Sequence, residues 1–255
     1  MNPTSQSAVS SCPKILMLHG YAQSGHVLQC KTRFLKPQVR DAVLNALQQD
    51  ANSKPVDVVE FHYPSGTWPM KLDQPRESNE LWTWGHGESM TGRIRGLEQS
   101  VDDIFRYLEK NGPFLGVMGF SSGAAAGAII ASLLEKRHSI GNFQFNTDHP
   151  PLKFVVAVCG FALKDPLYND FYSPKIETPI FLAIASLDVI VDESESLRLR
   201  DSSTNTALCF FEGAHYVPRD KVFLKSLVQF IEDALSIKED HEEDWEDCGD
   251  NCGLQ

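Results

Sequence analysis

The sequence predicts an α/β fold with a mostly parallel central sheet of about six strands and helices on both faces. Short, almost wholly apolar runs of strand length alternate with longer segments of helical spacing, and this alternation is typical of parallel sheets. The length of 255 residues suits one large domain. The hydrophobic share of 42% is that of a globular chain.

The expected strands are short segments rich in apolar residues, and Lys14–Leu18 is an almost wholly apolar run that ends at His19-Gly20. A run without polar alternation is typical of a strand buried on both faces. The expected strands are Lys14–Leu18, Val56–Phe61, Phe114–Phe120, Phe154–Cys159, Ile180–Ile184 and Ala207–Phe211.

The expected helices are the segments whose apolar residues recur every three or four positions. The expected helix Ile94–Lys110 stops at Asn111-Gly112-Pro113, and the expected helix Ser122–Lys136 begins with small residues. They are Gly25–Asp50 with a break near Pro37, Ile94–Lys110, Ser122–Lys136 and Val222–Leu235.

Three segments fall outside this pattern. Residues 1–13 are rich in Ser, Thr and Pro and predict a flexible N-terminus. Residues 63–92 fit no element well, and a long insertion in a compact domain usually forms a functional loop or lid. Residues 238–255 predict a mobile acidic tail, because like charges crowd there and almost nothing apolar accompanies them. Residues 14–237 are expected to form the domain itself.

Composition excludes several classes of protein. The net charge is −11, but eight acidic residues lie in the last 17 positions, which leaves −3 for the rest. No basic stripe suited to nucleic acid is present. No apolar run is long enough to span a membrane and no signal peptide opens the chain, so a cytoplasmic protein is expected.

The six cysteines form no CxxC pair. Cys159 and Cys209 lie in apolar runs, where a buried free thiol is expected. Cys248 and Cys252 lie close together in the acidic tail, and a redox-active disulfide between them stays an open alternative. We expect no structural metal and no cofactor.

The segment Gly119-Phe120-Ser121-Ser122-Gly123 is a G-x-S-x-G motif. This motif holds a serine on a sharp strand-to-helix turn, with its hydroxyl exposed above the sheet. Here it lies between an expected strand and an expected helix, as the turn requires. We therefore predict an α/β-hydrolase with Ser121 as nucleophile.

A serine hydroxyl needs a base, and the base needs an orienting acid. In this fold the acid follows the serine along the sequence, and the histidine base follows the acid. His215 lies just after the strand Ala207–Phe211 and is the predicted base, whereas His241 lies in the acidic tail. Asp188 follows the strand Ile180–Ile184 and is the predicted acid; Asp192 is its rival, and Asp165 and Asp170 are weaker alternatives.

The remaining site residues are expected to bind the substrate. The backbone N–H groups of Tyr21 and Ser122 are the predicted oxyanion donors, since one donor follows the nucleophile and the other comes from the loop after the first strand. His19, in that same loop, is expected to brace it. Trp68, Trp82 and Trp84 lie in the insertion, and either they only anchor it or at least one of them lines an acyl site.

The chain resembles the FSH family of serine hydrolases, known mainly from fungi and including ovarian tumour suppressor candidate-like esterases. The resemblance rests on Leu18–Gly25, Gly112–Ala124, Asp188 with Val191, and Gly213–Pro218. It implies a compact α/β-hydrolase, a Ser-Asp-His triad and esterase or thioesterase activity. Two departures stand out: members often have Gln where this chain has Ser122, and Gly is common at Ala185.

Three functions stay open. The first is a carboxylesterase acting on small-molecule acyl esters through an acyl-enzyme. The second is a thioesterase that releases an acyl or polyketide chain from a carrier protein, as some fungal relatives do in secondary metabolism. The third is a catalytically silent hydrolase-fold binding protein, against which an intact Ser121, Asp188 and His215 argue.

Overall fold

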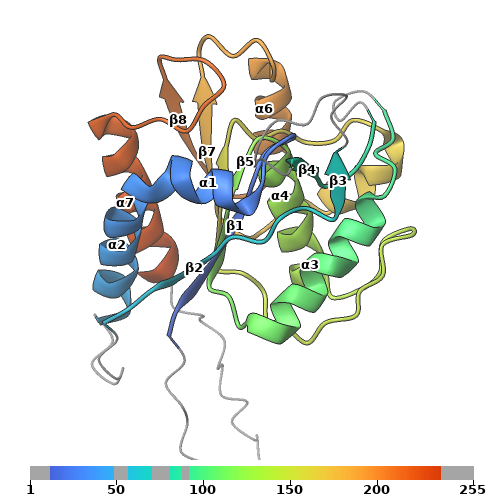
Figure 1. Cartoon of the computed structure of the whole chain (residues 1–255), viewed down its shortest axis with the longest axis horizontal. Coiled ribbons are helices and arrows are strands. Elements are labelled where there is room, and N and C mark those ends of the chain that lie inside the picture. Colours follow the sequence, from blue (N-terminus) through green and yellow to red (C-terminus); the bar gives the residue numbers. More distant parts are fainter. Residues whose placement is uncertain (1–11, 49–56, 71–80, 88–91, 237–255) are drawn as a thin grey trace, which may run out of the picture.

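The computed structural model describes residues 12–48, 57–70, 81–87 and 92–236. Its central sheet has six strands in the order β2-β1-β5-β6-β7-β8, and every neighbouring pair is parallel (Figure 1). The predicted fold class is confirmed. The strands are β1 (Lys14–Leu18), β2 (Glu60–His62), β5 (Gly116–Phe120), β6 (Phe154–Val158), β7 (Ile180–Ala185) and β8 (Thr206–Phe211).

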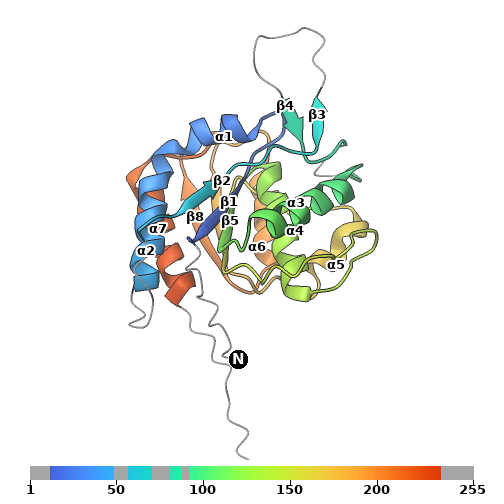
Figure 2. The same ribbon diagram turned by 60° about the horizontal axis from the view of Figure 1, so that its bottom comes forward.

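Helices cover both faces of this sheet, as Figures 1 and 2 show. One layer contains α1 (Gly25–Thr32), the 3-10 turn η1 (Arg33–Leu35), α2 (Lys36–Gln48) and α7 (Lys221–Ser236). The other contains α3 (Leu97–Asn111), α4 (Ser122–Lys136), η2 (Pro166–Tyr168), α5 (Asn169–Tyr172) and α6 (Glu193–Asp201).

The side chains of β1 alternate between the two faces of the sheet and contribute to the hydrophobic core on each face. Leu16 and Leu18 pack in the core under α3 and α4, whereas Ile15 and Met17 pack in the core under α2 and α7. Successive side chains of a strand point to opposite faces, so a fully apolar strand serves both layers. This explains why the strand was recognisable as an unbroken apolar run.

Two boundaries differ clearly from the sequence prediction. In place of the expected strand Val56–Phe61, the described residues contain the shorter strand Glu60–His62, because residues 57–59 do not pair with β1 at the sheet edge. The expected helix from Ile94 begins at Leu97, because Gly96 before it has φ +80°. The backbone N–H of Ile94 instead donates to the Tyr168 hydroxyl at 2.8 Å.

The insertion at 63–92 contains regular structure that the sequence did not indicate. β3 (Trp68–Met70) and β4 (Leu81–Thr83) form an antiparallel pair outside the main sheet (Figure 2). Residues 1–11, 49–56, 71–80, 88–91 and 237–255 lie outside the described residues, and with them the predicted tail 238–255, Cys248 and Cys252. The predictions for these segments therefore stay predictions.

Parallel strands bring their carboxyl ends to one edge of the sheet. His19 follows β1, Ser121 follows β5 and Cys159 follows β6, while the loops after β7 and β8 carry Asp188 and His215. The fold thus gathers chemically active side chains from across the chain at one edge.

Candidate active site

Ser121 lies on the sharp turn between β5 and α4. Its backbone has φ 55° and ψ −122°, a conformation that side-chain-bearing residues rarely adopt. The turn is held by hydrogen bonds: the Ser121 N–H donates to Val158 O at 2.9 Å, and its carbonyl accepts from the N–H of Ala124 at 2.9 Å. Such strain persists only where the surroundings enforce it, and it concentrates at functional sites.

The two glycines of the motif permit this turn. A Cβ on Gly119 would lie 2.4 Å from Gly123 O, and a Cβ on Gly123 would lie 2.2 Å from Leu18 O. Both distances are far below a van der Waals contact, and backbone atoms cannot move aside cheaply. The turn therefore requires glycine on both sides of the serine, as the motif indicated.

Asp188 and His215 meet at the same edge of the sheet. Nδ1 of His215 donates to Oδ2 of Asp188 at 2.6 Å. The other carboxylate oxygen accepts from the backbone N–H groups of Ile190 at 2.8 Å and Val191 at 2.9 Å. The Asp188 side chain is only 3% exposed, so the carboxylate is fixed on both sides.

These hydrogen bonds keep Asp188 ionised. Burial by itself would raise the pKa of its carboxyl group. The hydrogen bond from His215 and the two backbone N–H donors outweigh burial, and the pKa lies below its ordinary value. A charged carboxylate therefore faces the imidazole.

The imidazole of His215 also lies close to the serine turn. Its ring centroid is 4.9 Å from that of Phe120, the residue directly before Ser121. Within the described part of the chain, Nε2 of His215 has no hydrogen-bond partner. This nitrogen can accept a proton.

The carboxylates that the sequence offered as alternatives to Asp188 do not contact His215. Asp192 caps α6 and accepts from the Ser194 N–H at 2.9 Å. Asp165 caps η2 in the same manner, through the Leu167 N–H at 2.9 Å. Asp170 lies in the first turn of α5, and His241 lies outside the described residues. Among the described carboxylates, Asp188 is the one that contacts His215.

The loop after β1 lies against the serine turn. A Cβ built on Gly20 would be 3.3 Å from the Ser121 Cβ, so the backbone of this loop nearly touches the nucleophile. Tyr21 follows directly and, together with Ser122, lines one cavity beside the turn. The two predicted oxyanion donors therefore come from segments that adjoin Ser121.

His19 uses both of its ring nitrogens to hold this loop. Nδ1 donates to Gly20 O at 2.8 Å, and Nε2 accepts from the Gly66 N–H at 2.8 Å. Its own carbonyl accepts from Nε1 of Trp84 at 2.7 Å. Burial lowers the pKa of His19, which keeps the ring neutral. This arrangement is that of a bracing residue, as expected.

The three tryptophans have different surroundings. Trp84 is buried and lines the cavity that Tyr21 and Ser122 also line. Trp68 donates from Nε1 to Gly96 O at 2.9 Å, and Trp82 pairs with Gln23 through its backbone. Of the three, only Trp84 lies at the cavity beside the serine turn.

This cavity has a volume of about 50 Å³ and a mostly apolar wall. It lies between α4, the loop after β6 and the insertion. Its apolar walls include Trp84, Ala125, Ala126, Ile129, Phe161 and Leu163.

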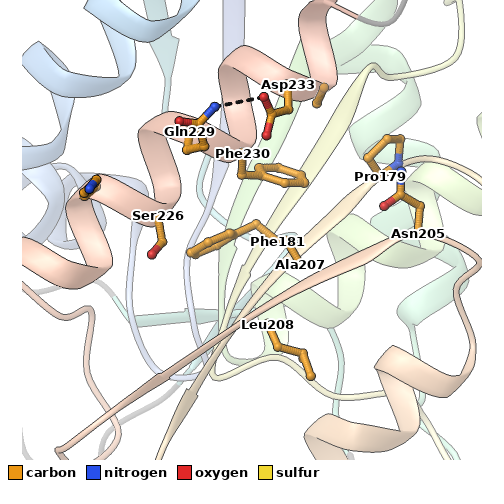
Figure 3. A pocket seen from close by; sticks show the side chains of 11 residues that line it. Pro179, Phe181, Asn205, Ala207, Leu208, Ser226, Gln229, Phe230 and Asp233 are labelled. Carbon is orange, nitrogen blue, oxygen red and sulfur yellow. Dashed lines mark hydrogen bonds between the residues drawn. The ribbon is translucent and has the colours of Figure 1, made fainter.

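A larger groove of about 510 Å³ lies elsewhere, between α7 and the starts of β7 and β8 (Figure 3). Phe181 and Phe230 form part of its wall, and Gln229 donates to Asp233 across a turn of α7 at 2.9 Å. No histidine or cysteine lines this groove, and it begins at the opposite end of the strands from Ser121. It is not the candidate site.

Cys159 is a neighbour of the site that sequence reasoning missed. The sequence predicted a buried free thiol, and Cys159 is buried and free. Its sulfur also lies within 4.8 Å of a ligand atom of Asp188 and of His215. The only signal was its place after β6, where parallel strands present functional residues.

These three side chains could in principle hold a metal ion. However, burial and the nearby Asp188 carboxylate raise the pKa of the Cys159 thiol, so the thiol stays protonated. A metal would also have to break the short hydrogen bond between Asp188 and His215. The arrangement favours the hydrogen-bonded pair over metal binding.

None of the helices in the described part of the chain is long and apolar enough to cross a membrane.

Comparison with known proteins places the chain in a family. The sequence pattern of "Serine hydrolase (FSH1)" matches residues 9–227, which is most of the chain. The Saccharomyces cerevisiae protein "Family of serine hydrolases 3" is 28% identical over 244 residues, covering 89% of this chain and 86% of that protein.

A Schizosaccharomyces pombe protein named dihydrofolate reductase is 27% identical over 235 residues. The match covers 86% of this chain but only 46% of that protein, so the chain spans about half of its length. Among solved structures, Zea mays acyl-protein thioesterase 2 superposes with a TM-score of 0.57 at 16% identity, over 90% of this chain and 96% of that chain. This likeness shows the shared fold.

Proposed function

Because the chain belongs to the serine hydrolase (FSH1) family, we propose that Ser121, His215 and Asp188 form a catalytic triad that hydrolyses acyl esters. That the chain is a hydrolase follows from its family; the triad and the substrate are our proposal. The observation that carries it is the 2.6 Å bond between His215 and Asp188 at the edge where Ser121 lies on its strained turn.

The first half-reaction acylates the enzyme. Nε2 of His215 takes the proton of the Ser121 hydroxyl as Oγ attacks the ester carbonyl carbon. The carbonyl oxygen gains negative charge and accepts hydrogen bonds from the N–H groups of Tyr21 and Ser122. As the tetrahedral intermediate collapses, His215 returns the proton to the leaving alcohol, and an acyl ester remains on Ser121.

The second half-reaction releases the acid. Water attacks the acyl carbon while His215 takes one of its protons, and the proton then passes to Ser121 Oγ as the acyl group leaves. Asp188 stays ionised throughout, holds the imidazole in the tautomer with its proton on Nδ1, and stabilises the imidazolium that forms. The low pKa of Asp188 suits this role.

The cavity beside the oxyanion donors suits the acyl group. Tyr21 and Ser122 both line it, so an acyl group whose carbonyl oxygen binds their N–H groups lies next to the cavity. Trp84 supplies an apolar wall there. A contribution of Trp68 and Trp82 to substrate binding stays a prediction.

A thioesterase is the second candidate, and one observation favours it. Asp188 is flanked by exposed apolar side chains: Leu187 is 63%, Val189 91% and Ile190 55% exposed. A thioester leaves as a thiol from the same acyl-enzyme, and an apolar rim beside the triad could receive a bulky thiol-bearing carrier. A carrier partner and a cytoplasmic location stay predictions from the sequence.

The test is active-site labelling of the full chain with a fluorophosphonate, followed by peptide mass spectrometry. We expect one label, on Ser121, and none in Ser121→Ala. Ser186→Ala is the matched control, because Ser186 is an exposed serine at the end of β7. A chain that takes no label and hydrolyses neither esters nor thioesters would support the silent binding protein instead.

A panel of esters and thioesters with identical acyl groups separates the two enzymatic candidates. Faster turnover of oxygen esters across all chain lengths supports the esterase. Consistently faster turnover of thioesters, reduced by Val189→Asp on the exposed rim, supports the thioesterase.

A further inference from the structure

One face of α4 forms a side of the cavity beside the serine turn. Ser122, Ala125, Ala126 and Ile129 all line this cavity. Residues spaced by three, four and seven positions lie on one face of a helix. The cavity therefore extends along α4, from Ser122 to a residue two turns, or about 10 Å, further along the helix axis.

The ends of the cavity differ in exposure. Tyr21 is 56% exposed and Gly87 is also exposed, whereas the apolar residues of the wall are all buried. In the proposed function, on which this inference rests, the N–H of Tyr21 binds the carbonyl oxygen of the substrate. An acyl chain would therefore enter the cavity at its exposed end.

Ile129 closes the inner end of the cavity along α4. Its side chain is buried. Side chains of a helix lean toward the N-terminus of that helix, so Ile129 leans toward Ser122 and over the preceding turn. Ala125 and Ala126 lie on that turn and leave space there, because their side chains are single methyl groups. An acyl chain that passes the two alanines meets Ile129.

The volume of the cavity limits the length of the acyl chain. A volume of about 50 Å³ accommodates roughly three to five water-sized groups. The carbonyl carbon itself lies at the oxyanion donors, outside this count. The acyl chain that fills the cavity is therefore short.

The polar groups of the wall offer no partner for a charge. Nε1 of Trp84 and the Thr83 hydroxyl each donate to a backbone carbonyl, at 2.7 Å and 2.8 Å. Oγ of Ser122 is covered by surrounding atoms, and the Tyr21 hydroxyl belongs to an exposed side chain that water can reach. None of the described lining residues is charged. A charged acyl group would lose its hydration there without compensation.

We propose that the substrate carries a short, uncharged acyl group of at most about six carbon atoms, which lies along α4 and ends against Ile129. The acyl group can be attached to an oxygen or to a sulfur atom, because the cavity receives only the acyl side of the bond. Ile129 is thus a specificity-determining residue for acyl length.

The experiment compares phenyl esters of acetate, butyrate, octanoate and succinate, the last as the hemiester. Each kcat/KM is divided by the rate of alkaline hydrolysis, which removes the intrinsic reactivity of the ester. We expect butyrate to exceed octanoate by about tenfold or more, because the extra methylene groups find no space. Butyrate should also exceed the hemisuccinate, which has a similar length but ends in a carboxylate.

Ile129→Ala removes the group that closes the inner end. It should raise the ratio of octanoate to butyrate turnover by about tenfold or more. Ile130→Ala is the matched control, because Ile130 is the next residue of the same helix, is equally buried and does not line the cavity. It should leave this ratio unchanged.

Ala126→Val tests the inference in the opposite direction and does not depend on the folding of Ile129→Ala. The added methyl groups fill the space over the middle of the cavity, so the ratio of butyrate to acetate turnover should fall by about tenfold.

Three results would overturn the inference while fluorophosphonate labelling of Ser121 still supports the hydrolase. They are turnover that does not decrease from butyrate to octanoate, equal turnover of butyrate and the hemisuccinate, and ratios that no cavity variant changes more than Ile130→Ala does. Absence of both turnover and labelling overturns the proposed function and the inference with it.

Discussion

Two histidines follow carboxyl ends of parallel strands, and the structure gives them opposite surroundings. His19, after β1, is fully buried, and both of its ring nitrogens are engaged by the backbone. His215, after β8, is partly exposed and bonded through Nδ1 to Asp188. In the described part of the chain, its Nε2 has no partner.

The difference shows that the place of a residue in the fold does not by itself define its role. A histidine with both nitrogens occupied can neither take nor deliver a proton without breaking the loop it holds. A histidine with one nitrogen oriented by a carboxylate and the other unoccupied is prepared for proton transfer. The same side chain is therefore a brace at one strand end and a proposed base at another.

The largest expected effect is that of His215→Ala. Removing the base should reduce kcat by about 10⁶-fold, because the serine then lacks a proton acceptor. The melting temperature should also fall, since one oxygen of the buried Asp188 carboxylate loses its donor. Steady-state kinetics and calorimetry measure both; near-native turnover would remove His215 from the mechanism.

The second-largest effect is expected for Asp188→Asn, which should reduce kcat by about 10⁴-fold. The amide can no longer accept from Nδ1 as a carboxylate does, so the imidazole loses its orientation and its compensating charge. Asp192→Asn is the control, because asparagine caps a helix as well as aspartate does and Asp192 serves as such a cap. An inactive Asp192→Asn beside an active Asp188→Asn would reverse the assignment.

His19→Ala should act on stability. It leaves the buried Gly66 N–H without its acceptor, which costs about 1–3 kcal/mol of the free energy of unfolding. Urea denaturation measures this loss, and His26→Ala, at an exposed position on α1, should have little effect. Unchanged stability with abolished turnover would instead make His19 part of the chemistry.

The smallest effect concerns pH. Burial lowers the pKa of His19 and of His149 below the ordinary value of about 6.5. Below that pH the unfolded chain binds protons that the folded chain does not, so stability is full above about pH 6.5 and falls as pH decreases through the folded pKa values. Asp188, whose pKa is also lowered, contributes a loss only below about pH 3.9.

Urea denaturation at pH 7.5, 6.5 and 5.5 tests this window. The native chain should be less stable at pH 5.5 than at pH 7.5, and His19→Ala should show a weaker dependence because His149 alone remains. A native chain whose stability is the same at all three values would contradict the proposed neutrality of the buried rings.

Several parts of the fold and the site could be predicted because their causes are local. β1 and α4 have the predicted boundaries, since one is an unbroken apolar run and the other opens directly on the serine turn. Asp188 and His215 were predicted as partners from their places after apolar runs, and their side chains are hydrogen-bonded in the structure; their catalytic roles stay predictions. The helix α6 was missed because few of its residues are buried, although Asp192 and Glu195 form an N-terminal capping pattern that indicates it.

By itself, the sequence determined the order of strands and helices and the turn around Ser121, because hydrophobic periodicity and glycine positions act over a few residues. Only the tertiary structure decided which tryptophan reaches the cavity, that both ring nitrogens of His19 are occupied, and that Cys159 lies beside the proposed triad. These outcomes depend on contacts between segments far apart along the chain, and packing across the sheet, rather than local pattern, determines which atoms meet.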